Sequence, residues 1–183
     1  MLKEPLVTKR LTLRRLEAGD ASRISLLAGD WEVSRMMAAV PRPYDEAMVK
    51  NWIDLTLRQW EAGVTYDFTI ERGEDKLVIG GIGLERTNTA KAELGYWLGR
   101  PYWRQGYGAE AAGRVIKFGF NDLGLDCIVS ASLPTNTSSI GILEKLGFTF
   151  QCREQQYFPA RGEKKEVASF ALSRAEYSAL DLN

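Results

Sequence analysis

The stretch Trp103-Arg104-Gln105-Gly106-Tyr107-Gly108-Ala109-Glu110-Ala111 decides the fold class, because it has the composition of a loop that runs into a helix. Apolar residues at helical spacing continue over 108–120. Gly106 and Gly108 let the backbone approach a ligand closely, since a Cβ atom would block that approach. Backbone N–H groups at the positive end of a helix bind anions. The stretch therefore predicts an anion site at 105–109, although a Gly-x-Gly pair is also common in plain turns.

Gly106, Gly108 and Ala111 also fit the fingerprint of dinucleotide-binding proteins, with Asp126 near the expected acidic position. That fingerprint follows directly on a buried parallel strand, whereas residues 101–104 intervene here. The preceding strands also have the pattern of hairpins. The chain is too short for a second nucleotide-binding half and a substrate domain, so we do not favour this alternative.

Outward from this stretch, strand and helix patterns alternate along the chain. We expect one α/β domain over 1–183, with a mixed sheet that is antiparallel early and parallel around Leu94–Leu133. The predicted strands are 8–16, 65–71, 77–86, 92–98, 126–133, 148–158 and 166–172. The predicted helices are one capped by Asp20, a short one within 31–40, one ending at Gly63 with a repeat through Met48, Trp52, Leu55 and Gln59, then 108–120 and 138–146.

The composition excludes several classes of function. Lys plus Arg is 24, Asp plus Glu is 24, and His is absent, so imidazole bases and His-containing metal sites are excluded. Zero net charge argues against direct nucleic-acid and membrane partners. Cys127 and Cys152 form no metal-ligand spacing, so we expect two core residues and no metal. Residues 1–5 hold no apolar leader and no 18-residue apolar run exists, which predicts a soluble, cytoplasmic protein.

A second motif lies 30 residues beyond Gly106. It reads Asn136-Thr137-Ser138-Ser139-Ile140, followed by Glu144-Lys145-Leu146-Gly147-Phe148. Asn136 can cap a helix, and Gly147 can end it in the left-handed conformation. Capping alone would account for this motif.

In this order and spacing the segments resemble the GNAT superfamily of acetyl-CoA-dependent N-acetyltransferases. The resemblance is closest to the RimJ/RimL-like branch, which acetylates N-terminal residues of ribosomal proteins. Arg104 departs from the family pattern, because glycine is usual there; Trp103 replaces a frequent Arg or Gln. The matching segments are TKRLTLRRLEAGD at 8–20, ELGYWL at 93–98, the stretch at 103–111, and Asn136-x-x-Ser139 with EKLGF at 144–148.

The resemblance implies a single-domain GNAT (acyl-CoA N-acyltransferase) fold, whose mixed, mostly antiparallel sheet is splayed at its centre and flanked by helices. The pantetheine arm of acetyl-CoA would lie in the gap along the free edge of 92–99. The pyrophosphate would meet the N–H groups of 105–109, with Lys145 or Arg104 neutralising charge. The residues implied in cofactor binding are Trp97, Leu98, Trp103, Arg104, Gln105, Gly106, Tyr107, Gly108, Ala109, Asn136, Ser139 and Lys145.

The resemblance also implies direct transfer of the acetyl group to a primary amine in a ternary complex. Glu93 is the first candidate for general base and Glu85 the second, although each could be a solvated charge at a strand end. Ser139 is the candidate that meets the leaving thiolate, or only a helix-capping residue. Tyr107 and Tyr157 are further candidate proton donors.

An α-amino group has a pKa of about 7.7–8.0 and a lysine side chain about 10.4, so an α-amine demands less of the base. We therefore expect a protein N-terminal amine as acceptor. The alternative acceptors are small amines: a polyamine, an amino acid analogue or an aminoglycoside. The alternative to an enzyme is a non-catalytic acyl-CoA-binding module. Specificity is expected from residues 31–44 and 155–164, where Met36 and Met37 could be core or pocket. A homodimer through an edge strand is left open.

Overall fold

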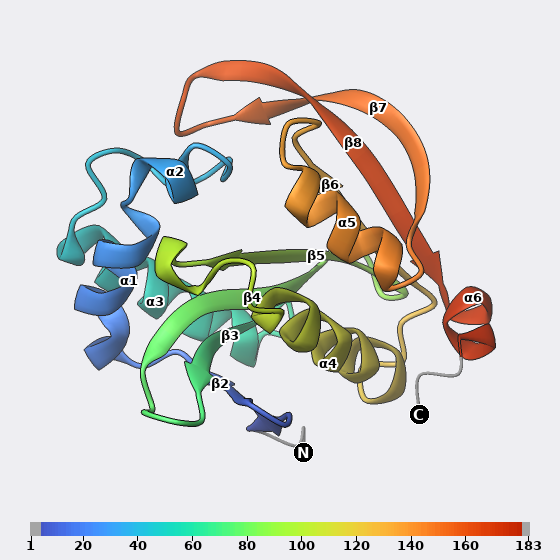
Figure 1. Ribbon diagram of the computed structural model, residues 1–183, viewed down its shortest axis with the longest axis horizontal. Coiled ribbons are helices and arrows are strands. Elements are labelled where there is room, and N and C mark those ends of the chain that lie inside the picture. Colours follow the sequence, from blue (N-terminus) through green and yellow to red (C-terminus); the bar gives the residue numbers. More distant parts are fainter. Residues whose placement is uncertain (1–4, 181–183) are drawn as a thin grey trace.

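The computed structural model describes residues 5–180, which build a single eight-stranded sheet in the order β1-β2-β3-β4-β5-β6-β8-β7 (Figure 1). Neighbouring strands are antiparallel except for the parallel pair β5 and β6. The strands are β1 (Leu6–Val7), β2 (Leu11–Arg15), β3 (Thr65–Arg72), β4 (Val78–Arg86), β5 (Lys91–Leu98), β6 (Cys127–Ser132), β7 (Thr149–Phe158) and β8 (Glu163–Ser173). The helices are α1 (Ala21–Ala28), α2 (Trp31–Ser34), α3 (Glu46–Glu61), α4 (Tyr107–Asn121), α5 (Thr137–Lys145) and α6 (Arg174–Ala179), with short 3-10 turns η1 (Ala18–Asp20) and η2 (Arg100–Tyr102).

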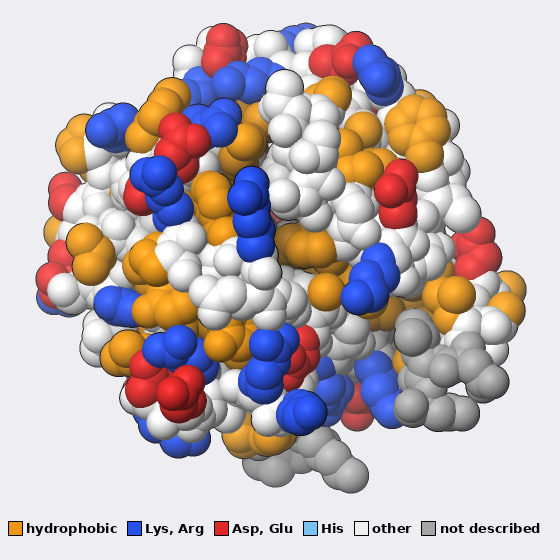
Figure 2. Space-filling view, in the orientation of Figure 1, with side chains coloured by type: hydrophobic (Ala, Val, Ile, Leu, Met, Phe, Trp, Pro, Cys, Tyr) orange, Lys and Arg blue, Asp and Glu red, His pale blue; other side chains and the backbone are white. Residues whose placement is uncertain are grey.

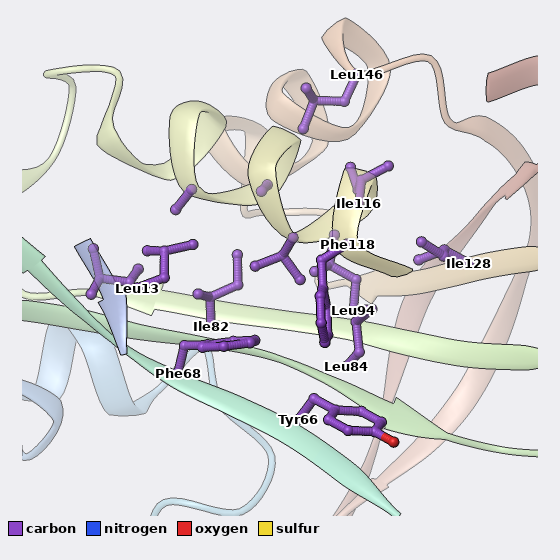
Figure 3. Close-up of a cluster of buried hydrophobic side chains, with 14 of the residues drawn as sticks. Leu13, Tyr66, Phe68, Ile82, Leu84, Leu94, Ile116, Phe118, Ile128 and Leu146 are labelled. Atoms are coloured by element: carbon purple, nitrogen blue, oxygen red, sulfur yellow. The ribbon is translucent and has the colours of Figure 1, made fainter. Parts of the chain in front are cut away.

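Two apolar clusters hold helices on opposite faces of the sheet. The larger cluster joins α4 to the sheet, with Phe118 of α4 packed edge-on against Phe68 of β3 (Figure 3). The smaller cluster joins α1 and α3 to the other face around Ile53 and Val78. Each such side chain, fully buried, stabilises the fold by roughly 1.5–3 kcal/mol.

The sheet opens at its centre, where the parallel pair is only three residues long. Lys91–Glu93 pair with Cys127–Val129, and β6 then continues beside β8 as far as Ser132. The Ser130 hydroxyl donates to the Leu94 carbonyl oxygen at 2.9 Å, at the point where the two strands part. Beyond that point the edge of β5 has no strand partner among the described residues. The predicted splayed, mixed sheet is confirmed.

Several local predictions need correction. The buried residues of α3 are Val49, Ile53, Thr56 and Trp60, so the repeat through Met48 and Leu55 marked the exposed side of the helix. A hydrophobic count cannot separate these faces, because α3 carries apolar residues on both.

Asp20 does not cap α1; its carboxylate forms an ion pair with Arg14 at 2.8 Å. Cys152 is exposed and Cys127 is half-buried, so the expectation of two core cysteines was wrong. No helix within residues 5–180 is both long enough and apolar enough to cross a bilayer.

Candidate active site

A cavity of about 950 Å³ passes through the split between β5 and β6 and is lined from both faces of the sheet. On the α4 face it meets the start of α4 and the first turns of α5. On the α1–α3 face it meets the strands β3, β4 and β5 and the segment 32–40. Because the cavity is lined from both faces, it has room for two molecules that approach from opposite sides of the sheet. In the middle of the face seen in Figure 2, Lys and Arg side chains lie around exposed hydrophobic atoms.

The start of α4 has the geometry of an anion site. Gly106 is its N-cap with φ +80°, and no side chain caps the helix. The first-turn N–H groups, which lack intrahelical acceptors at any helix start, are thus left for a ligand. By contrast, Asp45 caps α3 and Asn136 caps α5. Arg104 has φ +60°, a conformation that costs a non-glycine residue about 1–2 kcal/mol.

Arg10, between β1 and β2, holds this helix start in place. Its guanidinium lies 4.5 Å from the centre of the Tyr107 ring and donates to the Gln105 carbonyl oxygen at 2.9 Å. It also forms an ion pair with Glu110 at 2.6 Å. Tyr107, a candidate proton donor, is buried beneath Arg10 at the start of α4. Sequence reasoning missed Arg10, because nothing in its local pattern links it to a helix some 95 residues away.

The free edge of β5 directs alternate backbone groups into the split. The carbonyl oxygens of Leu94 and Leu98 point to this side, since they accept from Ser130 at 2.9 Å and from the Trp103 indole at 2.8 Å. Backbone groups alternate along a strand, so those of Tyr96 point the same way. An extended molecule can pair with this edge as an added strand would.

The first turn of α5 presents a hydroxyl to the cavity. Asn136 accepts from the Ser139 N–H at 3.2 Å, so its side-chain oxygen caps the helix as predicted. The Ser139 hydroxyl lies 2.9 Å from the Tyr96 hydroxyl, which crosses from β5. Lys145, at the end of α5, is exposed and also lines the cavity. Sequence reasoning missed Tyr96, which read as one more apolar strand residue.

The α1–α3 face of the split carries a different set of side chains. Strand alternation places Glu93 and Trp97 on this face of β5, with the exposed Gly95 between them. A Cβ added to Gly95 would meet nothing within 4 Å, so the space above it is open. The Trp97 indole occupies the space above Gly81. Trp97, implied above in cofactor binding, thus directs its side chain to the face opposite α4.

Asp67 of β3 joins Glu93 and Glu85 on that face. Register pairs Asp67 with Gly83, and Glu85 with Glu93. The Asp67 carboxylate accepts from the Thr65 hydroxyl at 2.6 Å and covers Gly83, where a Cβ would collide with it.

Burial raises the pKa of two carboxyls in this group. The pKa of Asp67 rises to about 6, because burial penalises its charge, with repulsion from Glu85 adding to the shift. Burial, followed by repulsion from Glu85, also raises the pKa of Glu93. Sequence reasoning missed Asp67, since a lone acidic residue in a strand reads as a surface position.

The tip of the β7–β8 hairpin lies near α2 and the segment that follows it (Figure 1). Arg161 donates to the carbonyl oxygens of Ser34 at 2.9 Å and Val40 at 3.0 Å. Met36 and Met37 line the cavity, so of the two alternatives left open above they are pocket residues and not core residues. Tyr157, the other candidate proton donor, is 56% exposed on β7 and does not line the cavity.

An open helix start, an unpaired strand edge and half-buried carboxyl groups meet at one split in the sheet. This combination suits a transferase that binds an extended, phosphate-bearing carrier. Residues 5–180 contain no group of three or more Cys, Asp or Glu side chains placed to hold a metal ion.

The chain belongs to the GNAT acetyltransferase family, whose domain matches residues 10–149, and it is an acetyl-CoA-dependent N-acetyltransferase. An uncharacterised N-acetyltransferase of Bacillus licheniformis, p20, is 33% identical over 177 residues, covering 96% of this chain and 99% of that protein. Mycobacterium smegmatis RimJ in complex with CoA-disulfide shares the fold, with a TM-score of 0.79 at 20% identity over 91% of this chain and 83% of that one. Spermidine N-acetyltransferase of Vibrio cholerae, in complex with CoA and spermine, does so with 0.79 at 21% identity over 93% and 99%. The family resemblance is confirmed, and the dinucleotide-binding alternative was wrong.

Proposed function

We propose that this enzyme acetylates an α-amino group, with a protein N-terminus as the acceptor. Acetyl-CoA binds on the α4 face, with its pyrophosphate at the N–H groups of 105–109 and its pantetheine arm along the free edge of β5. Arg104 and Lys145 neutralise phosphate charge. The acceptor enters from the α1–α3 face, so the amine and the thioester meet in the split.

The arrangement of acid and base groups supports this direction of approach. Glu93 and Asp67 lie on the acceptor side of the sheet. Ser139 of α5 lies on the α4 side, across β5 from Glu93. A carboxylate on the acceptor side accepts the proton that the amine loses, through a water where the reach is too long. The Ser139 hydroxyl donates to the thiolate that leaves. A backbone N–H of the β5 edge, at Tyr96 or Leu98, meets the oxyanion.

What favours an α-amine is its own low pKa, and Asp67, with a pKa of about 6, is a weak base on the acceptor side that suits such an amine. An α-ammonium group with a pKa of about 7.7–8.0 loses its proton to such a carboxylate at a cost of about 2 units. A lysine or alkylamine near 10.4 would cost more than about 4 units. Each unit is about 1.4 kcal/mol, so the α-amine is favoured by about 3 kcal/mol. This difference is set by the two amines and is the same for any base.

A polyamine is the second candidate, and one observation favours it. Asp67, Glu85 and Glu93 place three carboxyl groups on the acceptor face, which would attract a multiply charged amine. The fold shared with the spermidine enzyme agrees with this alternative without deciding it.

Thiol release from acetyl-CoA tests the acceptor class. We expect turnover with lysine-containing peptides that have a free N-terminus. We expect none when the N-terminus of the same peptides is acetylated, because only the lysine side chain is then left as an amine. Spermidine is the competing substrate. Turnover of spermidine alone would refute the α-amine proposal in favour of the polyamine.

Variants of the carboxylates test the base. Glu93→Gln and Asp67→Asn should each lower kcat, by about 10²-fold for the principal base. Asp67→Asn should also remove the rise in kcat/KM with pH near 6. Asp54→Asn, an exposed change on α3, is the matched control. Two variants with the activity and pH profile of the wild type would refute a base at either position.

Binding of acetyl-CoA is measured separately by thermal melting. At 100 times its Kd, acetyl-CoA should stabilise the protein by about 2.7 kcal/mol, and Gly106→Val should abolish most of this shift. NADH serves as the control ligand. A protein that melts identically with and without saturating acetyl-CoA would contradict the proposed cofactor site.

A further inference from the structure

We propose that Tyr96 is a positioning residue, whose hydroxyl orients the Ser139 hydroxyl toward the sulfur of the leaving CoA. The inference rests on the proposed role of Ser139. It assigns to a strand residue the task of setting the direction of a hydrogen bond made by a helix residue.

Two contacts define the pair. The Tyr96 oxygen lies 2.9 Å from the Ser139 Oγ and 3.2 Å from the Ser139 backbone carbonyl oxygen. A tyrosine hydroxyl has one proton, so it can donate to one of these oxygens at a time. The choice between them decides where the serine proton points.

When Tyr96 donates to the carbonyl oxygen, the Ser139 hydroxyl donates back to Tyr96 and is turned away from other acceptors. When Tyr96 donates to the Ser139 Oγ, the serine proton is free to donate to a third group. Both residues line the cavity in the split, so that third group is whatever lies there. A thiolate, as a negatively charged acceptor, selects the second arrangement.

The backbone of Ser139 is fixed independently. Asn136 accepts from its N–H at 3.2 Å, which sets the position of the first turn of α5. Free rotation about one side-chain torsion therefore remains, and the Tyr96 contact is what restricts it. Tyr96 itself is anchored through β5, whose pairing with β4 runs from Ala92 to Leu98.

Tyr96 stays a donor over the working pH range. Burial raises the pKa of its hydroxyl above the ordinary value of 10.0, while the contact with Ser139 opposes the shift. A thiol titrates near 8.5, well below a tyrosine. Tyr96 thus keeps its proton while the thiolate leaves. The amine nitrogen forms its bond to the acetyl carbon, the C–S bond breaks, the sulfur takes the electron pair of that bond, and the Ser139 hydroxyl donates a hydrogen bond to the sulfur.

The two tyrosines considered above as candidate proton donors do not offer this geometry. Tyr107 lies beneath the Arg10 guanidinium, and Tyr157 is exposed on β7 outside the cavity. Tyr177 stacks on Phe120 at 4.5 Å, on α6 beyond the lining of the cavity. Tyr177→Phe is therefore a matched control, because it removes one hydroxyl from a partly buried ring.

Kinetics of a double-mutant cycle test the pairing. Tyr96→Phe should lower kcat about tenfold and leave the KM for acetyl-CoA within about twofold. In the Ser139→Ala background the same change should cost less than about twofold, because the partner is gone. A kcat for Tyr96→Phe equal to that of Tyr177→Phe would overturn the proposal. So would an undiminished loss in the Ser139→Ala background, which would show that Tyr96 acts without Ser139.

The pKa of the thiol of bound CoA provides a measurement that needs no acceptor. Ultraviolet absorbance of the thiolate should show ionisation at lower pH in the wild-type complex than in Tyr96→Phe or Ser139→Ala, with no further change in the double variant. If Ser139→Ala shifts this titration and Tyr96→Phe does not, the present inference fails while the role of Ser139 stands. If neither shifts it, the proposed role of Ser139 fails, and the inference with it.

Discussion

Replacing Asp67 with asparagine should stabilise the protein while lowering its activity. The carboxyl is partly buried and its pKa is about 6, against an ordinary value of 3.8. Above pH 6 the Asp67 carboxyl is charged in the folded protein, and because burial penalises this charge it lowers the stability of the fold. Asparagine has nearly the same shape, carries no charge, and its oxygen can still accept from the Thr65 hydroxyl.

The magnitude follows from linkage. A difference of about 2 pKa units corresponds to at most about 3 kcal/mol, and we expect a gain of about 1–3 kcal/mol at pH 8. For a chain of this size that is a rise in Tm of roughly 3–10 °C.

The pH dependence has a definite sign. Because the folded state binds the Asp67 proton more tightly than the unfolded state, the contribution of Asp67 to stability falls as pH rises from about 4 through 6. The Asp67→Asn variant lacks this loss, so its gain over the wild type should be small near pH 4.5 and reach its plateau above about pH 6.5.

Thermal melting of the wild type and Asp67→Asn across pH 4.5 to 8 is the assay, with the exposed change Asp54→Asn as the control. The control should show no comparable gain at either end of the range. A variant that melts at or below the wild-type temperature at pH 8, or whose gain is the same at pH 4.5, would refute a buried, charge-strained carboxylate.

Three further changes address the two sides of the split. Arg104→Gly removes a strained φ and a cation: stability should rise by about 1 kcal/mol while the KM for acetyl-CoA rises a few fold, and an unchanged KM would count against the phosphate role. Gly95→Val fills open space: the KM for the acceptor should rise about tenfold or more with that for acetyl-CoA nearly unchanged, and the reverse pattern would contradict the assignment of faces. Arg161→Met should weaken acceptor binding and lower Tm by roughly 2–6 °C; a wild-type acceptor KM would remove the hairpin tip from the acceptor site.

The order of elements was predictable because the strands alternate with a period of two and the helices have clear ends. Asn136 caps the start of α5 and Gly147, at φ +87°, follows its end, as the sequence suggested. The face of α3 was not predictable, since Met48 and Val49 are equally apolar and only the sheet decides which one is buried.

The candidate site was predictable only where one local motif forms it. The loop at Gly106 is a continuous stretch, so its open helix start could be read directly. Tyr96, Asp67 and Arg10 each act through partners more than 15 residues away or on another strand. Their roles depend on register, which fixes the direction of a side chain and which no local pattern of one strand reveals.

The β7–β8 hairpin, whose Arg161 reaches the segment after α2, has a consequence for the order in which parts of the protein are made during synthesis. Strand β8 is the last to be made, yet it inserts between β6 and β7. The Arg161 bond to the Ser34 carbonyl oxygen joins residues 127 positions apart. On the proposed assignment of faces, the acetyl-CoA side is built from residues that precede the end of α5, whereas the acceptor side also needs the C-terminal hairpin. During synthesis the residues of the proposed donor side are therefore made before those that complete the proposed acceptor side.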